Sequence, residues 1–342
     1  MDLQNRKELK ETARQRLTGA QDAVKIALIY ASIIVGASLL VNGVRFFLDS
    51  QISQFGGLRN MGLRSVLSTI QTMMPIVLQF LLMALALGFT GSMLRIGRGQ
   101  YASPMSMKIG FDRFWVLLRA TLLQGGLYAL ALLAAYIISM QVFFLTPMSR
   151  GLISAMAPML KDTTGDVMEL LANPAVLDQM MTAMIPLYLL MGAIFLAVAA
   201  PIHYRYILVK YLIIDEPGNG ALAMMRESRM LMRRKAMSFF KLDLSLWVYY
   251  AANIVAMLVC YGVSILSLCG VALPGNVMAL SLICFAVYLV LTFLITLFLQ
   301  PHMEVTHALA YECLKPRQQA SGGAVLGNIF DLAREQMQNF DM

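Results

Sequence analysis

Six long segments of mostly apolar residues constrain what this chain can fold into. A helix needs about 20 consecutive apolar residues to cross the hydrocarbon core of a membrane, and each segment is long enough. Soluble helices are seldom apolar on every side, so the sequence predicts an all-α, polytopic membrane bundle of about six transmembrane helices. The predicted spans are roughly Ala23–Phe47, Met73–Leu94, Phe114–Leu145, Ile185–Ile214, Leu242–Leu268 and Val277–Leu299. A kink is expected at Pro201, in the fourth span.

The composition supports the bilayer as the solvent for much of the surface. Of 342 residues, 59% are hydrophobic and 13% are charged, whereas soluble domains are about 45–50% apolar and about 25% charged. A soluble fold of this composition would expose large apolar patches, which soluble monomers rarely do. The net charge of +8 would point to nucleic acid in a soluble protein, but here the distribution of charge is more informative.

Lysine and arginine are distributed unequally between the two sets of connecting segments. Of the 27 basic residues, 22 fall in the N-terminal region, the second and fourth links and the C-terminal region, and the other five are Arg45, Arg59, Arg64, Arg150 and Lys161. Cytoplasmic segments carry the excess of positive charge. The pattern therefore predicts a multi-pass plasma-membrane protein with an even number of spans and both termini in the cytoplasm.

The same reasoning divides the chain into three regions. Residues 1–22 are expected to form a cytoplasmic amphipathic helix, residues 23–314 the six-span domain, and residues 315–342 a cytoplasmic tail. An outer loop over 146–183, with a break at Asn173–Ala175, is expected to contain one or two short helices. Ala272–Asn276 predicts a tight outer turn. The cysteines are read as reduced thiols, with a Cys260–Cys269 bridge as the alternative.

A basic helix is predicted over residues 217–241, with Asn219 as a possible N-cap. On a helix, Arg226, Arg229 and Arg233 share one narrow stripe, and Lys235 interrupts the opposite, apolar face. That face consists of Ala221, Met224, Met225, Ser228, Leu231, Met232 and Phe239. The pattern is typical of a helix lying in a membrane interface, where anionic headgroups attract each cation by about 1 kcal/mol.

Three interpretations of this helix remain. It lies on the lipid surface or docks on the cytoplasmic ends of the bundle, it binds a soluble anionic ligand or a partner protein, or it binds nucleic acid. The last is disfavoured because no aromatic residues suited to base stacking are interleaved with the arginines. The predicted contact residues are Arg226, Arg229, Arg233, Arg234 and Lys235, and Glu227 and Asp243 are expected to neutralise nearby arginines.

The motifs of common enzymes do not occur. The sequence contains no Walker A, GxGxxG, HExxH, GxSxG or CxxC pattern. His302, Glu304 and His307 invite a metal interpretation, with His203 as a further ligand, but the two imidazoles of the pair would lie about 140° apart on a helix. We therefore expect no catalytic residues, no cofactor and no metal. The spans carry no acid that we expect at mid-membrane, which weakens proton-coupled transport.

Three parts of the chain resemble the bacterial integral-membrane family called domain of unknown function 975. The resemblance rests on "NRKELKETARQRL", on "GSMLRIGRGQ" with "KIGFDRFW", and on the segment from Tyr204 to Trp247. Matching residues are Tyr211, Asp215, Pro217, Ala223, Ser228, Leu231, Met232, Lys235, Phe240, Leu242, Leu244, Ser245 and Trp247. Arg233 or Arg234 stands where the family usually has Gly. The resemblance implies a membrane fold and location, and no activity.

Two functions follow as expectations. The first is a non-enzymatic envelope protein that interacts with anionic lipid headgroups of the cytoplasmic leaflet and possible partners, either another protein or a further copy of itself. The alternative is a transporter or export component for a small or amphipathic molecule. It is favoured by a weak internal repeat of the links after the second and fourth spans, by Pro201 and by the outer loop.

Overall fold

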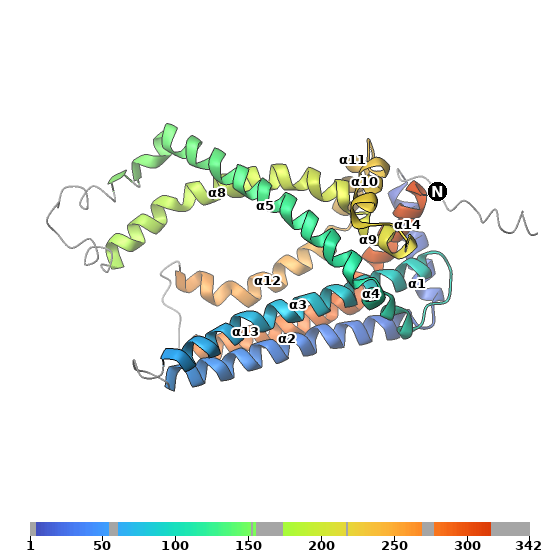
Figure 1. Ribbon diagram of the computed structural model, residues 1–342, viewed down its shortest axis with the longest axis horizontal. Coiled ribbons are helices and arrows are strands. Elements are labelled where there is room, and N and C mark those ends of the chain that lie inside the picture. Colours follow the sequence, from blue (N-terminus) through green and yellow to red (C-terminus); the bar gives the residue numbers. More distant parts are fainter. Residues whose placement is uncertain are drawn as a thin grey trace, which may run out of the picture. The chain divides into compact units, whose positions relative to one another are not determined.

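The computed structural model describes residues 5–54, 61–151, 153–154, 174–216, 218–268 and 277–315, and these are helical apart from short turns. The chain divides into two compact units (Figure 1). The first comprises Met1–Asp112 together with Ser238–Met342, and the second comprises Arg113–Met237. Each unit is described by itself.

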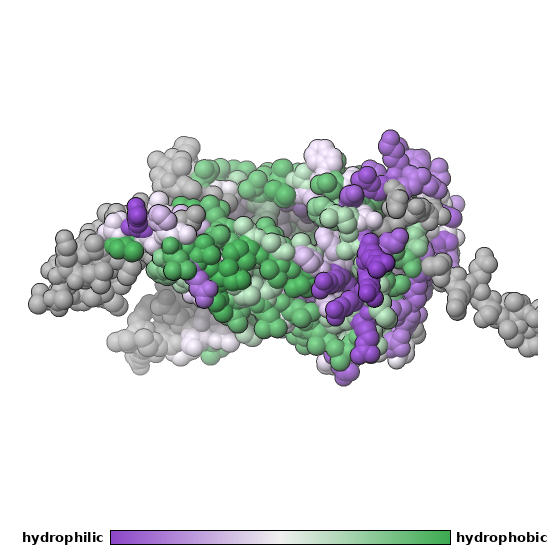
Figure 2. Space-filling model, turned by 90° about the horizontal axis from the view of Figure 1, so that it is seen from above, coloured by the Kyte–Doolittle hydropathy of each residue, from purple (hydrophilic) through white to green (hydrophobic). Residues whose placement is uncertain are grey.

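Long apolar helices form the body of the first unit. They are α2 (Ala23–Gln54), α3 (Met61–Gly97), α12 (Trp247–Leu268) and α13 (Val277–Leu294). Helices α2, α3 and α13 run side by side (Figure 1). Large apolar side chains remain exposed on them, among them Leu40, Val77 and Ile283, and the molecule shows broad hydrophobic surface (Figure 2). Such surface is stable against lipid tails and costly against water.

The polar end of the first unit is built around helix α14 (Gln300–Leu314). A π-helical turn, Ile295–Leu299, joins α13 to α14 just before Pro301, which donates no backbone hydrogen bond and whose ring crowds the carbonyl four residues earlier. Nearly every residue of α14 from Pro301 to Tyr311 is buried. It packs against α3 and against α1 (Arg6–Gly19). Helix α1 is the helix predicted over residues 1–22, and it ends earlier, at Gly19.

Helix α3 is in backbone contact with the segment that follows it. After Gly97 the chain forms the 3₁₀-helix η2 (Pro104–Lys108) and the short helix α4 (Ile109–Asp112), which pack back on α3. A Cβ atom at Gly88 would lie 1.9 Å from the carbonyl oxygen of Met107, and one at Gly110 would lie 1.8 Å from that of Ala84. Only glycine allows so close an approach.

The predicted span Leu242–Leu268 is bent rather than straight. Helix α11 (Ala236–Ser245) and the start of α12 meet at an angle of 65° around Leu246. Here the N–H of Leu246 bonds to the carbonyl of Asp243 at 2.9 Å, and the N–H of Tyr249 bonds to that of Leu246 at 3.0 Å. These bonds span three residues instead of four, which interrupts the regular α-helical ladder.

Two long helices form the core of the second unit. Helix α5 (Phe114–Leu145) has the predicted bounds, and it packs along α8 (Pro174–Tyr206), with Phe143 and Leu187 buried between them. The fourth predicted span continues through Pro201, and its helix is interrupted six residues later, at Ile207–Leu208, before α9 (Val209–Asp215). Helix α8 begins at Pro174, so the outer loop predicted over 146–183 ends earlier. Proline suits the first turn of a helix, where no N–H bond is lost.

The predicted fold class is confirmed. Five helices in the described part of the chain are long and apolar enough to cross a membrane, and the bent pair α11–α12 adds a sixth if it forms one span. The protein is therefore an all-helical, multi-pass membrane bundle. Residues 155–173 of the predicted outer loop over 146–183, where its short helices are not tested, lie outside the described residues, as do the turn at Ala272–Asn276, Cys269 and the tail after Lys315.

Candidate functional sites

Helix α10 (Ala221–Leu231) carries the first two of the predicted contact residues. Its buried face consists of Ala221, Met224, Met225 and Ser228, and it packs on α5, α8 and α9 of the second unit. The Ser228 hydroxyl donates a hydrogen bond to the backbone carbonyl of Arg205 at 2.9 Å. Arg226 and Arg229 lie exposed. The predicted apolar face is thus present, and it is covered by protein.

The helix predicted over 217–241 is interrupted after Leu231. Residues 232–235 form a turn, and α11 begins at Ala236. Arg233 therefore does not continue the helical stripe of Arg226 and Arg229. The expected N-cap also differs, because Gly220 occupies that position and the Asn219 amide donates to the Glu216 carboxylate instead.

The turn owes its shape to one residue in the left-handed region. Arg234 has φ of 65°, a conformation that costs most residues other than glycine about 1–2 kcal/mol. The family pattern places Gly at Arg233 or Arg234. The positive φ of Arg234 shows that this is the position where glycine would remove backbone strain. Two features of the sequence are consistent with this turn, namely Lys235, which interrupts the apolar face, and the glycine of the family pattern.

The structure brings the five predicted cations together on α10 and the following turn. All five side chains are exposed: Arg226, Arg229, Arg233, Arg234 and Lys235. We call them the basic elbow. Its buried side is fixed to the helices of the second unit by Met224, Met225 and Ser228, so its cations lie on the side that remains open. Such a surface attracts phosphate groups.

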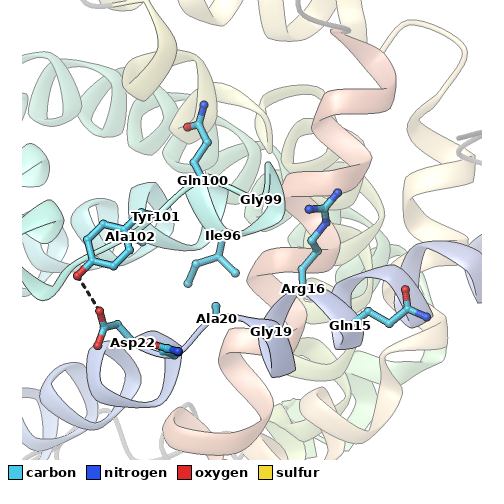
Figure 3. Close-up of a pocket in the computed structure, with 11 residues that line it drawn as sticks. Gln15, Arg16, Gly19, Ala20, Asp22, Ile96, Gly99, Gln100, Tyr101 and Ala102 are labelled. Carbon is cyan, nitrogen blue, oxygen red and sulfur yellow. Dashed lines mark hydrogen bonds between the residues drawn. The ribbon is translucent and has the colours of Figure 1, made fainter.

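A cavity of about 410 Å³ lies in the first unit, where α1 ends and α2 begins, beside the C-terminal end of α3. Its polar lining includes Gln15, Arg16, Gln21, Gln100 and Tyr101 (Figure 3). None of these residues was singled out from the sequence as a site. They come from two polar segments whose proximity no local pattern indicates.

Asp22 holds the two walls of the cavity together. Its carboxylate accepts a hydrogen bond from Lys25 Nζ at 2.8 Å. It accepts a second from the hydroxyl of Tyr101, also at 2.8 Å (Figure 3). The hydrogen bond from Lys25, and then the one from Tyr101, holds the pKa of Asp22 below its usual value. The bond to Asp22 correspondingly raises the pKa of Tyr101.

Arg16 lies against the turn that ends α3. The N–H of Gly99 bonds to the carbonyl of Ile96 and that of Gln100 to the carbonyl of Arg95, which is the hydrogen-bond pattern of a Schellman motif. Gly99 has φ of 72°, and a Cβ atom there would lie 2.2 Å from Nη1 of Arg16. Glycine therefore allows both the turn and the approach of the guanidinium.

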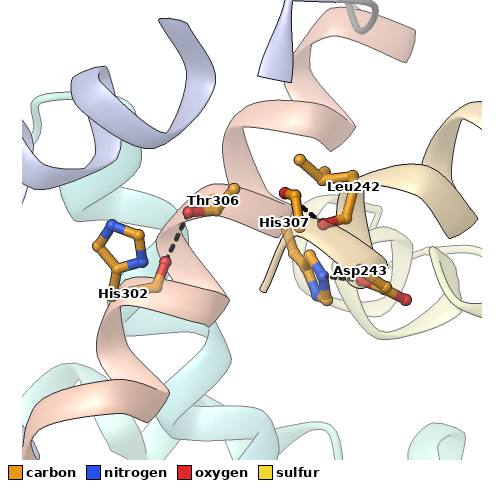
Figure 4. A network of polar contacts seen from close by, with 6 residues as sticks. Leu242, Asp243, His302, Thr306 and His307 are labelled. Atoms are coloured by element: carbon orange, nitrogen blue, oxygen red, sulfur yellow. Dashed lines mark hydrogen bonds and ion pairs between the residues drawn. The ribbon is translucent and has the colours of Figure 1, made fainter. Parts of the chain in front are cut away.

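A buried polar pair joins α11 and α14 in the first unit. Nε2 of His307 lies 2.6 Å from Oδ1 of Asp243, and the side chains are only 4% and 6% exposed (Figure 4). The ring of Phe239 packs on the imidazole, with centroids 5.4 Å apart. Asp243, which the sequence associated with nearby arginines, thus has a partner that sequence reasoning missed. The separation of 64 positions explains why.

The histidines do not converge on one ion. His302 points away from His307 on α14 (Figure 4), and His203 belongs to the second unit, where Nδ1 lies 3.5 Å from the hydroxyl of Tyr128. Glu304 is buried and accepts a hydrogen bond from Thr90 at 3.4 Å. Within the described residues, no group of three or more His, Cys, Asp or Glu side chains could hold a metal.

The comparisons with known proteins give one match. The model of the family described as "Protein of unknown function (DUF975)" matches residues 1–318, which confirms the resemblance noted in the sequence. Neither the curated proteins nor the solved structures provide a match. The matched region contains the whole second unit, with the basic elbow, and the first unit up to residue 318, and on that evidence the chain belongs to the DUF975 family of proteins of unknown function.

Proposed function

We propose that this protein is a non-enzymatic membrane protein of the cytoplasmic leaflet that engages anionic lipid headgroups through its basic elbow. The supporting observation is the arrangement of α10. Met224, Met225 and Ser228 are buried against the unit's own helices, and Arg226 and Arg229 are exposed. Because protein covers the apolar face, the exposed cations carry the interaction with lipid. In this proposal both termini lie in the cytoplasm of a plasma-membrane protein.

The conformation of Arg234 supports the same function. A cation stands where the backbone favours glycine, at φ of 65°, and it is flanked by Arg233 and Lys235. A non-glycine residue in this region lowers stability by about 1–2 kcal/mol. Residues held in such conformations cluster at functional sites. A phosphate-rich surface would gain from three consecutive cations, which offsets the cost of the strain.

Lipid enrichment around the full-length protein tests the proposal. The protein is reconstituted in nanodiscs of phosphatidylcholine and phosphatidylglycerol, repurified, and the lipid ratio in its annulus is measured. The R226Q/R229Q variant should carry less phosphatidylglycerol than the wild type, and the difference should shrink at high salt because salt screens exposed charges. The R226K/R229K variant is the matched control, since it keeps both charges, and it should retain the enrichment.

Two outcomes would contradict the proposal. The first is equal phosphatidylglycerol enrichment for the wild type and the R226Q/R229Q variant. The second is an equal loss in the glutamine and lysine variants, which would indicate a structural role for the arginines. The proposed orientation is tested separately, by reporter fusions at the two ends. Reporters that respond on opposite sides of the membrane would exclude an even number of spans.

A transport function is the second candidate, and the buried polar groups of the first unit favour it. Asp243, Glu304 and His307 are almost fully buried among membrane helices, and ionisable residues in such places commonly mark ion or substrate pathways. Substrate-dependent flux into proteoliposomes that contain the wild-type protein, and no such flux into protein-free liposomes, would support transport. Absence of flux across a broad panel of solutes and amphiphiles would exclude it.

A further inference from the structure

We propose that the cavity of the first unit binds the phosphate group of a phosphate-bearing ligand, with Arg16 as its cationic contact. Two sources of that group fit, a phospholipid headgroup and a soluble phosphate ester. The cavity and the basic elbow lie in different units, so this inference does not depend on the function proposed for the elbow. The argument rests on the charge, the donors, the size and the position of the cavity.

The charges of the cavity favour an anion. Asp22 is the acid among the lining residues, and its two carboxylate oxygens already accept hydrogen bonds from Lys25 and Tyr101. Arg16 has no carboxylate partner among the described residues. Its planar guanidinium can donate two parallel hydrogen bonds to one phosphate, a geometry that a point charge such as ammonium does not provide.

Neutral donors surround the same space. Gln15, Gln21 and Gln100 are among the residues that line the cavity, and the amide nitrogen of each side chain carries two N–H donors. Ile96 and Ala102 are buried and form its apolar part. A site with one cation, several amides and an apolar wall suits a phosphate ester whose substituent is partly apolar.

The size and the position of the cavity fit a headgroup. Its volume of about 410 Å³ lies within the range of about 300–1,000 Å³ that is typical of ligand sites. It lies where the apolar helix α2 begins, at Ala23, and where α3 ends, at Gly97. A lipid whose phosphate occupied the cavity could extend its acyl chains along these two helices, so an amphiphile should bind better than the free headgroup.

The walls of the cavity are fixed before any ligand binds. Gly99 ends α3 in a Schellman motif, and Tyr101 is tied to Asp22 on the opposite wall. Preorganisation of this kind reduces the entropy that a ligand must lose on binding. The competing explanation is that Arg16 only stabilises the last carbonyls of α3. That role would affect the stability of the protein and not its affinity for phosphate.

Calorimetric titration of the detergent-purified, full-length protein distinguishes the two explanations. The probes are dioctanoyl-phosphatidylglycerol, glycerophosphoglycerol and inorganic phosphate. We expect R16Q to weaken binding of the lipid probe by about tenfold or more, as is usual when a hydrogen-bonded charge is lost. The matched control is R14Q, which removes the same charge from the same helix about 200° away and should leave the affinity within twofold.

A pocket-filling variant keeps the test valid if R16Q does not fold. A Cβ atom at Gly19, which lines the cavity, would meet no atom within 4 Å, so G19L should fold and block the site. Tighter binding of the lipid probe than of glycerophosphoglycerol assigns the phosphate to a lipid, and equal binding assigns it to a soluble ester. The proposal would be overturned if R16Q bound the lipid probe as tightly as the wild type does. It would also be overturned if R14Q and R16Q lost affinity equally, or if no probe bound. The R226Q/R229Q variant should bind normally, which separates this result from that for the elbow.

Discussion

Nε2 of His307 and Oδ1 of Asp243 lie 2.6 Å apart in the buried polar end of the first unit. The pair connects α14 to α11 immediately before the 65° bend at Leu246. Because both side chains are almost wholly buried, the contact between them satisfies polar atoms that have little access to water. The pair is therefore a point at which the packing of α11 on α14 can be tested directly.

Removal of one member of this pair should destabilise the protein strongly. We expect D243L to lower the free energy of unfolding by about 3 kcal/mol, because the buried imidazole loses its partner. The D243L/H307L double variant should lose less than the sum of the two single variants, because both single changes break the same contact. Unfolding in mixed detergent micelles measures all three. Additive losses would show that the two residues do not interact.

Replacement of Arg234 by glycine should stabilise the turn between α10 and α11. Glycine adopts positive φ without strain, so R234G should raise the free energy of unfolding by about 1 kcal/mol. R233G provides the control at the neighbouring position, where φ is not positive, and should be neutral or destabilising. A thermal unfolding series followed by circular dichroism would show both effects. Stabilisation by R233G and not by R234G would contradict the assignment of the left-handed residue.

The contact between α3 and α4 should not accept a side chain. We expect G110A to destabilise the protein by about 3 kcal/mol, since its Cβ atom would overlap the backbone at Ala84 and Gly88. G36A, in α2, is the matched control, because a Cβ atom there meets no atom within 4 Å. That change should be neutral or stabilise by about 0.5–1 kcal/mol. Equal stability of the two variants would show that the helices are less closely packed.

The contact between Asp22 and Tyr101 should give a small acid dependence. The hydrogen bonds from Lys25 and Tyr101 hold the pKa of Asp22 in the folded protein below its usual value. Their contribution to stability is therefore present at higher pH and is lost as the pH falls through the folded pKa. Melting temperatures of the wild type and D22N should differ at pH 7 and converge below about pH 4. Y101F should show a smaller acid dependence than the wild type. A constant gap down to pH 3 would exclude this linkage.

Sequence reasoning recovered the helices more reliably than their ends. The bounds of α5 were predicted to the residue because polar segments flank its apolar run on both sides. The bend at Leu246 was missed because Leu242–Leu268 is mostly apolar, and hydropathy does not register a change in hydrogen-bond spacing. The break after Leu231 was missed because one interruption of the apolar face, at Lys235, does not by itself indicate the end of a helix.

The candidate sites divide in the same way. The basic elbow was found because its cations are close together in the sequence. The cavity beside Arg16 and the pair of Asp243 and His307 were missed because they form between segments that are far apart in the chain. His302 and His307 were considered together for the opposite reason, namely that they are neighbours in sequence, although the structure points their side chains in different directions (Figure 4).

The contacts at Gly88 and Gly110 have a mechanical consequence. They fasten the segment after α3 back onto that helix through backbone atoms, and the Schellman turn at Gly99 fastens its beginning. The segment between them, which includes Tyr101 and forms one wall of the cavity, is thus anchored at both ends to a helix about 55 Å long. Side chains could absorb a small displacement of this wall, but backbone contacts transmit it. A displacement of this wall is therefore passed directly to the backbone of the C-terminal part of α3 and the turn that ends it, from Ala84 to Gly99.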